Sequence, residues 1–153
     1  MVSIMPTIRT ILHPTDLSEN SQPAFHMACA LARDYGAKLV VLYIYPPPVN
    51  GAEAVDRDRD NAFEEGLKEK LHQLVPDDRG VVIDYKGAES SSPAEAILDM
   101  AKQCDLVVMG THGRTGLRRM LMGSVAEKVL REAACPVITV RAGMKIPAPV
   151  GSD

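Results

Sequence analysis

The clearest fold signal in the sequence is Asp105-Leu-Val-Val-Met-Gly110 with the glycine-rich segment after it, Thr-His-Gly113-Arg-Thr-Gly-Leu-Arg-Arg-Met-Leu-Met-Gly123-Ser124. Short β-branched runs such as 105–110 are typical of strands. The residues from Ser124 onward have the apolar spacing of a helix. A strand that leads through glycines into the start of a helix predicts a βα unit.

The same alternation continues outward from this stretch in both directions. The almost unbroken apolar run at 38–45 is typical of a parallel strand that is buried on both faces. In all, we expect strands at 8–13, 38–45, 81–86, 105–110 and 136–141. Helical spacing predicts helices between Ser21 and Gly36, at 62–74, after Ser92 and at 124–133.

This order of elements predicts a single α/β domain of the Rossmann-like kind. Right-handed crossovers give an open, twisted, five-stranded parallel sheet in the order 3-2-1-4-5, with helices on both faces. We expect the domain to span residues 1–141. The remaining residues, 142–153, contain two prolines and two glycines and are expected to form a disordered tail.

Capping residues mark the ends of the expected helices. Gly36 suits the left-handed residue that ends a helix. Two Ser-x-x-Glu capping boxes, in which each side chain bonds a free backbone N–H group, are expected at Ser92–Glu95 and Ser124–Glu127. Pro93 suits the first helical position. We expect the last helix to bury Val125, Val129 and Leu130.

Composition and charge exclude several classes of function. The 153 residues include 17 basic and 20 acidic side chains, and a net charge of −3 argues against non-specific nucleic-acid binding. No apolar run approaches the roughly 18 residues of a membrane-spanning helix, and the first ten residues lack the features of a secretory signal. Cys29, Cys104 and Cys135 form no Cys-x-x-Cys pair, which predicts reduced thiols in a cytoplasmic protein.

The glycine-rich segment has the features of a phosphate site. Glycine lets the backbone come close to a ligand and adopt positive φ, and free N–H groups at a helix start bind phosphate oxygens. The Ser124 hydroxyl can add a hydrogen bond. The segment does not contain the Gly-x-x-x-x-Gly-Lys-Ser/Thr loop. The residues leave an alternative open, in which Gly110 and Gly113 are turn residues and Ser124 only caps the helix.

Pro14-Thr15-Asp16 follows the first expected strand. In the predicted sheet the first and fourth strands are neighbours whose crossovers diverge to opposite faces, and open α/β sheets bind ligands at such a switch point. Asp16 can accept hydrogen bonds from ribose hydroxyls there. Its alternative role is that of a turn or capping aspartate.

From Ile8 to Arg141 the chain resembles the universal stress protein family, UspA-like. The resemblance is carried by Ile11-Leu-His-Pro-Thr-Asp16, by the stretch quoted first, and by Cys135-Pro-Val. The family's ATP-binding branch has Gly, two residues, Gly, nine residues, Gly, and then Ser or Thr. In this chain Gly110, Gly113, Gly123 and Ser124 match each fixed position.

The resemblance implies ATP, with Mg²⁺, as the ligand. It places Asp16 at the ribose, Pro14 beside the adenine pocket and the backbone of Ile44 against adenine. Thr15 is included among the residues that bind the nucleotide. Met109 and Gly110 would line the nucleoside, and the phosphates would contact Gly113, Gly123, Ser124 and Val125. Arg114 is a further candidate for the γ-phosphate, with a solvated loop face as its alternative.

The resemblance also implies a homodimer formed through the strand at 137–140, and an unidentified protein partner. Pairing this strand with its copy would cover an exposed sheet edge. Two segments depart from the family pattern. The segment 86–93 looks longer than the usual turn before the third helix, and Pro46–Pro48 lie next to the expected adenine side.

These observations together predict an ATP-binding regulator of the stress response rather than an enzyme. The sequence offers no nucleophile–base pair and no set of metal ligands, and His13 and His112 are interpreted as packed or loop histidines. Two alternatives stay open. One is a slow ATPase or autophosphorylating enzyme that uses Asp16, and the other is a nucleotide-free dimeric interaction module.

Overall fold

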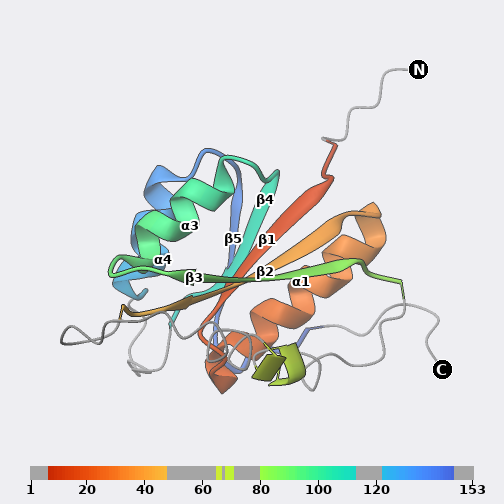
Figure 1. The fold of residues 1–153 in the computed structure, drawn as a ribbon. Helices are drawn as coiled ribbons and strands as arrows, with labels where there is room; N and C mark the ends of the chain where they lie inside the picture. Colours follow the sequence, from red (N-terminus) through yellow and green to blue (C-terminus); the bar gives the residue numbers. More distant parts are fainter. Residues whose placement is uncertain (1–6, 48–64, 67, 71–79, 113–121, 147–153) are drawn as a thin grey trace.

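The computed structural model describes residues 7–47, 65–66, 68–70, 80–112 and 122–146. A five-stranded, fully parallel sheet forms its centre (Figure 1). The strands lie in the order β3-β2-β1-β4-β5, which confirms the predicted topology. Their bounds are β1 Thr10–Thr15, β2 Lys38–Tyr45, β3 Ile83–Glu89, β4 Leu106–Gly110 and β5 Val137–Val140.

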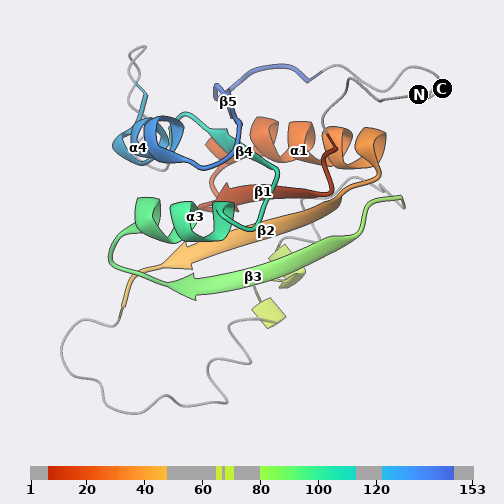
Figure 2. The same cartoon turned by 90° about the horizontal axis from the view of Figure 1, so that it is seen from above.

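Helices cover both faces of the sheet, as Figure 2 shows. A short 3-10 helix, η1 (Glu19–Ser21), leads into α1 (Gln22–Tyr35), which packs on one face. On the other face lie α3 (Pro93–Ala101) and α4 (Ser124–Glu132). The connection after β1 therefore goes to one face and the connection after β4 to the other. The carboxyl ends of these two neighbouring strands therefore mark a topological switch point.

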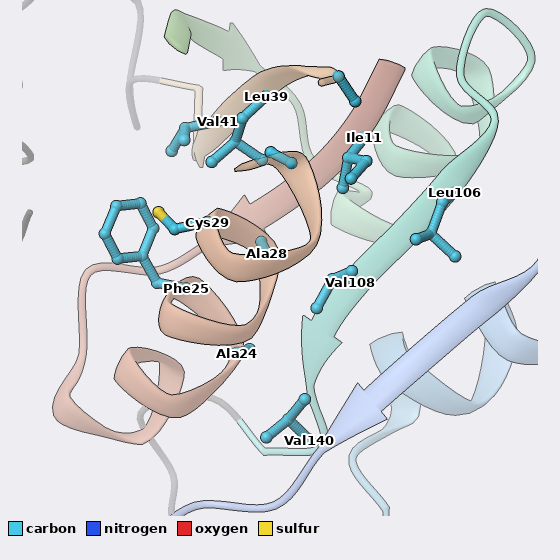
Figure 3. Close-up of a cluster of buried hydrophobic side chains, with 12 residues drawn as sticks. Ile11, Ala24, Phe25, Ala28, Cys29, Leu39, Val41, Leu106, Val108 and Val140 are labelled. Carbon is cyan, nitrogen blue, oxygen red and sulfur yellow. The ribbon is translucent and has the colours of Figure 1, made fainter. Parts of the chain in front are cut away.

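The core is divided into two layers by the sheet. Successive side chains of a strand point to opposite faces, so Val108 packs toward α1 with Ile11 and Phe25 (Figure 3), whereas Val107 packs toward Ile97 and other residues of α3 and α4. The burial of strands on both faces explains why β2 is apolar along most of its length.

The bounds of β1 and β3 differ most from those predicted. Asp105 Oδ2 accepts the N–H groups of Arg9 and Thr10 at 2.9 and 3.0 Å, and β1 runs on through Pro14 to Thr15. Pro14 pairs with Leu42 of β2. β3 continues to Glu89 because the backbone of 86–89 pairs with β2. The long loop expected at 86–93 is therefore wrong, and 90–92 alone join β3 to α3.

Neither predicted capping box is formed. Ser92 is the N-cap of α3, but its own N–H donates to Ser90 Oγ at 3.0 Å. This is the N–H that Glu95 would have bonded, and the Glu95 carboxylate instead accepts a hydrogen bond from Lys128 of α4. In α4 the N-cap is Gly123, so Ser124 lies at the first helical position and has no capping role.

The helix ends, one buried position and the tail can also be compared with what the sequence predicts. Gly36 ends α1 with φ 63°, and its N–H bonds the carbonyl groups of Ala32 and Arg33, as predicted. Leu130 is 46% exposed, so the expectation that it is buried is wrong, because Ala126 and Val129 form the inner face of α4. The expected helix at 62–74 lies mostly outside the described residues, and 65–66 and 68–70 are helical. Of the expected tail, residues 142–146 are described, and Ile146 packs against the α1-side core.

Candidate functional site

A cavity of about 290 Å³ lies at the carboxyl ends of β1 and β4. α3 and α4 contribute one wall, and the segment after β1 contributes another. The cavity coincides with the switch point at which open α/β sheets bind ligands. Its lining is formed by Pro14, Thr15, Asp16, Ser21, Ile44, Pro93, Ile97, Met109, Gly110, Thr111, His112, Gly123, Ser124, Val125 and Ala126.

The residues that the sequence singled out come together around this cavity. Those that the structure describes all belong to its lining, namely Pro14, Thr15, Asp16, Ile44, Met109, Gly110, Gly123, Ser124 and Val125. Gly113 and Arg114 lie outside the described residues. Segments far apart in the sequence thus form one concave surface.

The N-terminus of α4 opens into the cavity without a side-chain cap. Gly123, the N-cap, has φ −62° and ψ 155°, and no side chain bonds the first turn at this position. The Gly123 N–H donates to Thr111 O at 2.8 Å. The next N–H groups, of Ser124, Val125 and Ala126, have no acceptor within the helix, and all three residues line the cavity. Together with the positive end of the helix dipole, they form an anion-binding arrangement.

Gly123 is required here for lack of space. A Cβ at this position would lie 3.2 Å from Thr111 O, closer than an ordinary contact. A Cβ at Gly110 would meet Asn20 O at 3.6 Å, which is an ordinary van der Waals distance. Neither glycine has positive φ. The expectation that these glycines allow left-handed backbone is therefore wrong at the two described positions, and close approach of main chain is what Gly123 provides.

Asp16 both forms a turn and faces the cavity. Its Oδ1 accepts hydrogen bonds from the Ser18 N–H at 2.9 Å and from Ser18 Oγ at 2.6 Å. Leu17 between them has φ 65°, an uncommon conformation for a residue with a side chain. The loop thus holds the carboxylate at the cavity rim. The two interpretations of Asp16 are compatible, because one oxygen can shape the turn while the carboxylate lines the cavity.

His13 and His112 lie in different surroundings. His13 is fully buried beside Phe25, and its Nδ1 lies 2.9 Å from Val108 O. A carbonyl only accepts, so Nδ1 carries the proton, and the buried Nε2 has no partner. Burial lowers the pKa of His13 to about 4. His112 lines the cavity, half-buried, and its Nδ1 lies 2.9 Å from Thr111 Oγ1.

Apolar side chains form a large part of the lining. Ile44 and Met109 come from strands, and Pro93 and Ile97 come from the first turns of α3. Such a wall suits a flat, weakly polar ring, while the few polar groups fix its orientation. Sequence reasoning missed as lining residues Ser21, Pro93, Ile97, Thr111 and Ala126. The helical spacing after Ser92 was a signal for Ile97, but it did not say which residues of that helix reach the cavity.

The described lining carries little charge. Asp16 is its one carboxylate, and it holds no lysine or arginine among the residues that the structure places. Within the same residues, no group of three His, Cys, Asp or Glu side chains is arranged to hold a metal ion. Backbone N–H groups, hydroxyls and an imidazole therefore supply the polar contacts. These donors, with the space at Gly123, fit the phosphate of a nucleotide.

Comparisons with known proteins all point to the same family. Residues 7–141 match the model of the universal stress protein family. A universal stress protein of Methanocaldococcus jannaschii is 35% identical over 142 residues, which cover 87% of this chain and 82% of the relative. Universal stress protein UspA from Lactobacillus plantarum superimposes with a TM-score of 0.73 at 27% identity, over 90% of this chain and all of the other.

Two solved structures with the same fold contain nucleotides. A universal stress protein in complex with cAMP has a TM-score of 0.64 at 22% identity and covers 90% of this chain and 100% of its own. The universal stress protein from Archaeoglobus fulgidus in complex with dAMP has a TM-score of 0.59 at 21% identity, with the same coverage. In the described part of this chain, no helix combines the length and apolarity of a membrane span.

Proposed function

Because the chain belongs to the universal stress protein family, we propose that it binds ATP in the cavity between α3, α4 and the ends of β1 and β4. The bound nucleotide would regulate the shape or partner choice of a homodimer in the stress response. A nucleotide can do so only if it binds two conformations with different affinity. Cys29, Cys104 and Cys135 form no disulfide with one another, which supports a reducing, cytoplasmic setting.

The observation that carries the proposal is the uncapped N-terminus of α4. Its first N–H groups have no acceptor in the helix and line the cavity, and Gly123 leaves room for an anion to approach them. The start of α3 is different, because Pro93 occupies its first position and has no N–H. α4 is therefore the helix start suited to phosphate. Gly113 and Arg114 belong to the same proposed phosphate site.

The rest of the cavity supports an adenine nucleotide in particular. Ile44, Met109 and Ile97 offer apolar surface for the ring, and Asp16 offers a carboxylate for ribose hydroxyls. The complexes of the two related proteins with cAMP and dAMP support the same ligand class. Mg²⁺ would accompany ATP through the phosphates. In this proposal Pro14 and Thr15 shape the rim beside the ring.

The two edges of the sheet support a dimer formed through β5. β3 carries Asp84, Lys86 and Glu89, and charged side chains on an edge strand discourage pairing with another sheet. β5 has the sequence Val-Ile-Thr-Val and carries no charge. Pairing of β5 with its copy would satisfy the unpaired backbone groups of this edge.

The test begins with the nucleotide content of the purified protein, followed by calorimetric titration of ATP and Mg²⁺ into the stripped protein. We expect bound adenine nucleotide or micromolar affinity, lost in Gly123→Val. Gly80→Val is the matched control, because a Cβ at Gly80 meets nothing within 4 Å and Gly80 lies before β3, away from the cavity. A protein without nucleotide that gives no heat at millimolar ATP would contradict the proposal and favour a nucleotide-free interaction module.

Hydrolysis is measured in the same samples. The proposal is for a binding protein, because Asp16 Oδ1 already accepts two hydrogen bonds from Ser18, which hold the carboxylate in a turn. We expect phosphate release to be negligible on the timescale of binding. Turnover that disappears in Asp16→Ala, with nucleotide affinity retained, would support the slow ATPase instead.

A further inference from the structure

The segment after β1 places a carboxylate and two hydroxyls on the wall of the cavity. Thr15, Asp16 and Ser21 belong to the described lining, whereas Ser18, which lies between them in the chain, does not. All four side chains take part in one set of hydrogen bonds. These bonds show which side chain of the segment suits a ligand that donates a hydrogen bond, and what keeps that side chain in place.

Two hydrogen bonds from Ser18 orient the Asp16 carboxylate. Asp16 Oδ1 accepts the Ser18 N–H at 2.9 Å and the Ser18 hydroxyl at 2.6 Å. Hydrogen bonds to an ionised acceptor are the shorter and stronger kind. A carboxylate can accept about four hydrogen bonds, so the two from Ser18 orient the group without saturating it. Because Ser18 is not part of the described lining, its effect on a ligand passes through Asp16.

Ser18 is itself held by the residue that precedes α1. Its carbonyl accepts the Ser21 N–H at 3.1 Å and the Ser21 hydroxyl at 2.8 Å. Since the single proton of the Ser21 hydroxyl goes to this carbonyl, the Thr15 hydroxyl, 3.0 Å away, donates to Ser21 Oγ. Both hydroxyl protons are therefore used inside the segment. The Asp16 carboxylate is the side-chain group of this segment that suits a ligand hydroxyl.

The backbone between Asp16 and Ser18 is strained. Leu17 has φ 65°, a left-handed conformation that residues with a side chain rarely adopt. Its N–H donates to Thr15 Oγ1 at 3.0 Å, which helps to hold the turn. Strained backbone persists only where the surrounding contacts impose it. The turn therefore keeps the Asp16 carboxylate in one direction.

We propose that Ser18 is a positioning residue, and that through Asp16 it makes the cavity select ribonucleotides over deoxyribonucleotides. A fixed carboxylate can accept a hydrogen bond from a ribose hydroxyl, whereas a deoxyribose leaves the same acceptor without that partner. The inference rests on the proposed function, because it concerns the sugar of the same nucleotide. One hydrogen bond to a charged acceptor corresponds to a preference of about tenfold.

The experiment measures the affinities of ATP, its 2′-deoxy analogue and its 3′-deoxy analogue by calorimetry, at one pH and one free Mg²⁺ concentration. The two analogues allow for either ribose hydroxyl facing Asp16. Ser18→Ala removes the hydroxyl and keeps the N–H, and Ser18→Thr keeps both. Ser91→Ala is the matched control, because Ser91 is exposed in the loop before α3 and is not among the described lining residues.

We expect the wild type to prefer ATP to at least one analogue by about tenfold. In Ser18→Ala this preference should fall to about threefold or less, because the carboxylate loses one of the two bonds that orient it. Ser18→Thr and Ser91→Ala should keep the wild-type preference. A merely structural role of Ser18 would weaken all three nucleotides equally. An unchanged preference in Ser18→Ala would therefore overturn the inference.

The remaining outcomes separate this inference from the proposed function. Wild-type protein that binds ATP and both analogues with equal affinity would overturn the inference and leave ATP binding intact. Wild-type protein that binds none of the three would overturn both.

A double-mutant cycle tests whether Ser18 acts through Asp16. Asp16→Ala should abolish the preference for ATP, and adding Ser18→Ala should change it no further. A further change would show that Ser18 acts on the sugar by another route and would overturn the inference. Urea unfolding establishes that each variant is folded. Glycine adopts φ 65° without strain, so Leu17→Gly combined with Ser18→Ala gives the same comparison where Ser18→Ala alone is too unstable.

Discussion

At the scale of single residues, the charge that a histidine can carry is set by what its two ring nitrogens meet. His13 donates from Nδ1 to Val108 O and buries Nε2 without a partner. Desolvation is the largest cause that lowers its pKa, from 6.5 to about 4, whereas the hydrogen bond to Val108 and the charge of Asp16 act in the opposite direction. A residue that the sequence suggested only as a packed histidine therefore links stability to pH.

This link gives a prediction for stability in acid. The folded chain holds His13 neutral, so the unfolded chain binds more protons between pH 6.5 and about 4. The His13 contribution to the free energy of unfolding is complete above pH 6.5 and falls by about 2.5 kcal/mol by pH 4.5. His13→Asn, which retains a donor for Val108 O, should lack this part of the pH dependence. Urea unfolding of both proteins at pH 7.0 and 4.5 measures it, and equal losses would contradict the prediction.

A second residue-scale prediction concerns the two described glycines of the nucleotide pattern. Gly123→Ala forces a Cβ to within 3.2 Å of Thr111 O and should lower the free energy of unfolding by about 1 kcal/mol. Gly110→Ala meets Asn20 O at 3.6 Å and should change stability by less than about half of that. Denaturant unfolding of the two variants measures both changes in the free energy of unfolding. Equal destabilisation would show that crowding at Gly123 is not the reason for glycine.

At the scale of elements, the start of α3 is organised by its preceding loop. Ser90 Oγ accepts the Ser92 N–H at 3.0 Å and lies 3.0 Å from Ser92 O. The capping box predicted from Ser92 and Glu95 fails because Ser90 already occupies the N–H that Glu95 needs. A local sequence pattern cannot reveal such competition, because the competing hydroxyl belongs to a segment that the pattern leaves out.

The corresponding prediction compares how much Ser90 and Glu95 each contribute to the stability of the protein. Ser90→Ala should destabilise the protein by about 1 kcal/mol, because it leaves the Ser92 N–H at the helix start without its acceptor. Glu95→Ala should have little effect, because its ion pair with Lys128 is solvent-exposed. Thermal unfolding of both variants provides the comparison. A larger loss in Glu95→Ala would show that the bridge between α3 and α4 stabilises the helix start instead.

At the scale of the whole molecule, the order of the sheet was predictable and the ends of its elements were not. β2 was predicted at its observed bounds because its apolar run is a signal of burial on both faces. The end of β3 was not predicted, because Gly87–Glu89 join the sheet through backbone pairing that their side chains do not reveal. The solvent-exposed part of an edge strand needs no apolar side chains. The sequence therefore does not mark the residue at which such a strand ends.

The candidate site was predictable where residues follow strands directly and not where the site depends on packing. Asp16 and Gly110 lie at strand ends that meet at the switch point, so topology alone brings them together. Pro93 and Ile97 reach the cavity because α3 packs beside α4, and no motif in the sequence states that arrangement. Their positions follow from the tertiary structure.

A whole-molecule prediction concerns assembly. Pro136 O and Val140 O accept N–H groups of Val107 and Thr111 next to them in the sheet, so the backbone of Thr139 points away from β4. Thr139→Pro removes an outward N–H and leaves the bonds to β4 intact. We expect this variant to be monomeric and folded, and Thr139→Val to be dimeric. Light scattering after gel filtration measures this, and a dimeric Thr139→Pro protein would contradict pairing through β5.

The hydrogen bond between the Gly123 N–H and Thr111 O also has a consequence for the evolution of this sequence. It brings together the two ends of the segment that carries Gly113 and Arg114. In general, doubling the number of residues between two joined chain ends costs only about 0.6 kcal/mol in closure entropy. Insertions and deletions inside 113–121 should therefore leave the scaffold folded. Related chains can in this way acquire new ligand preferences by variation in one short stretch while they inherit the same sheet.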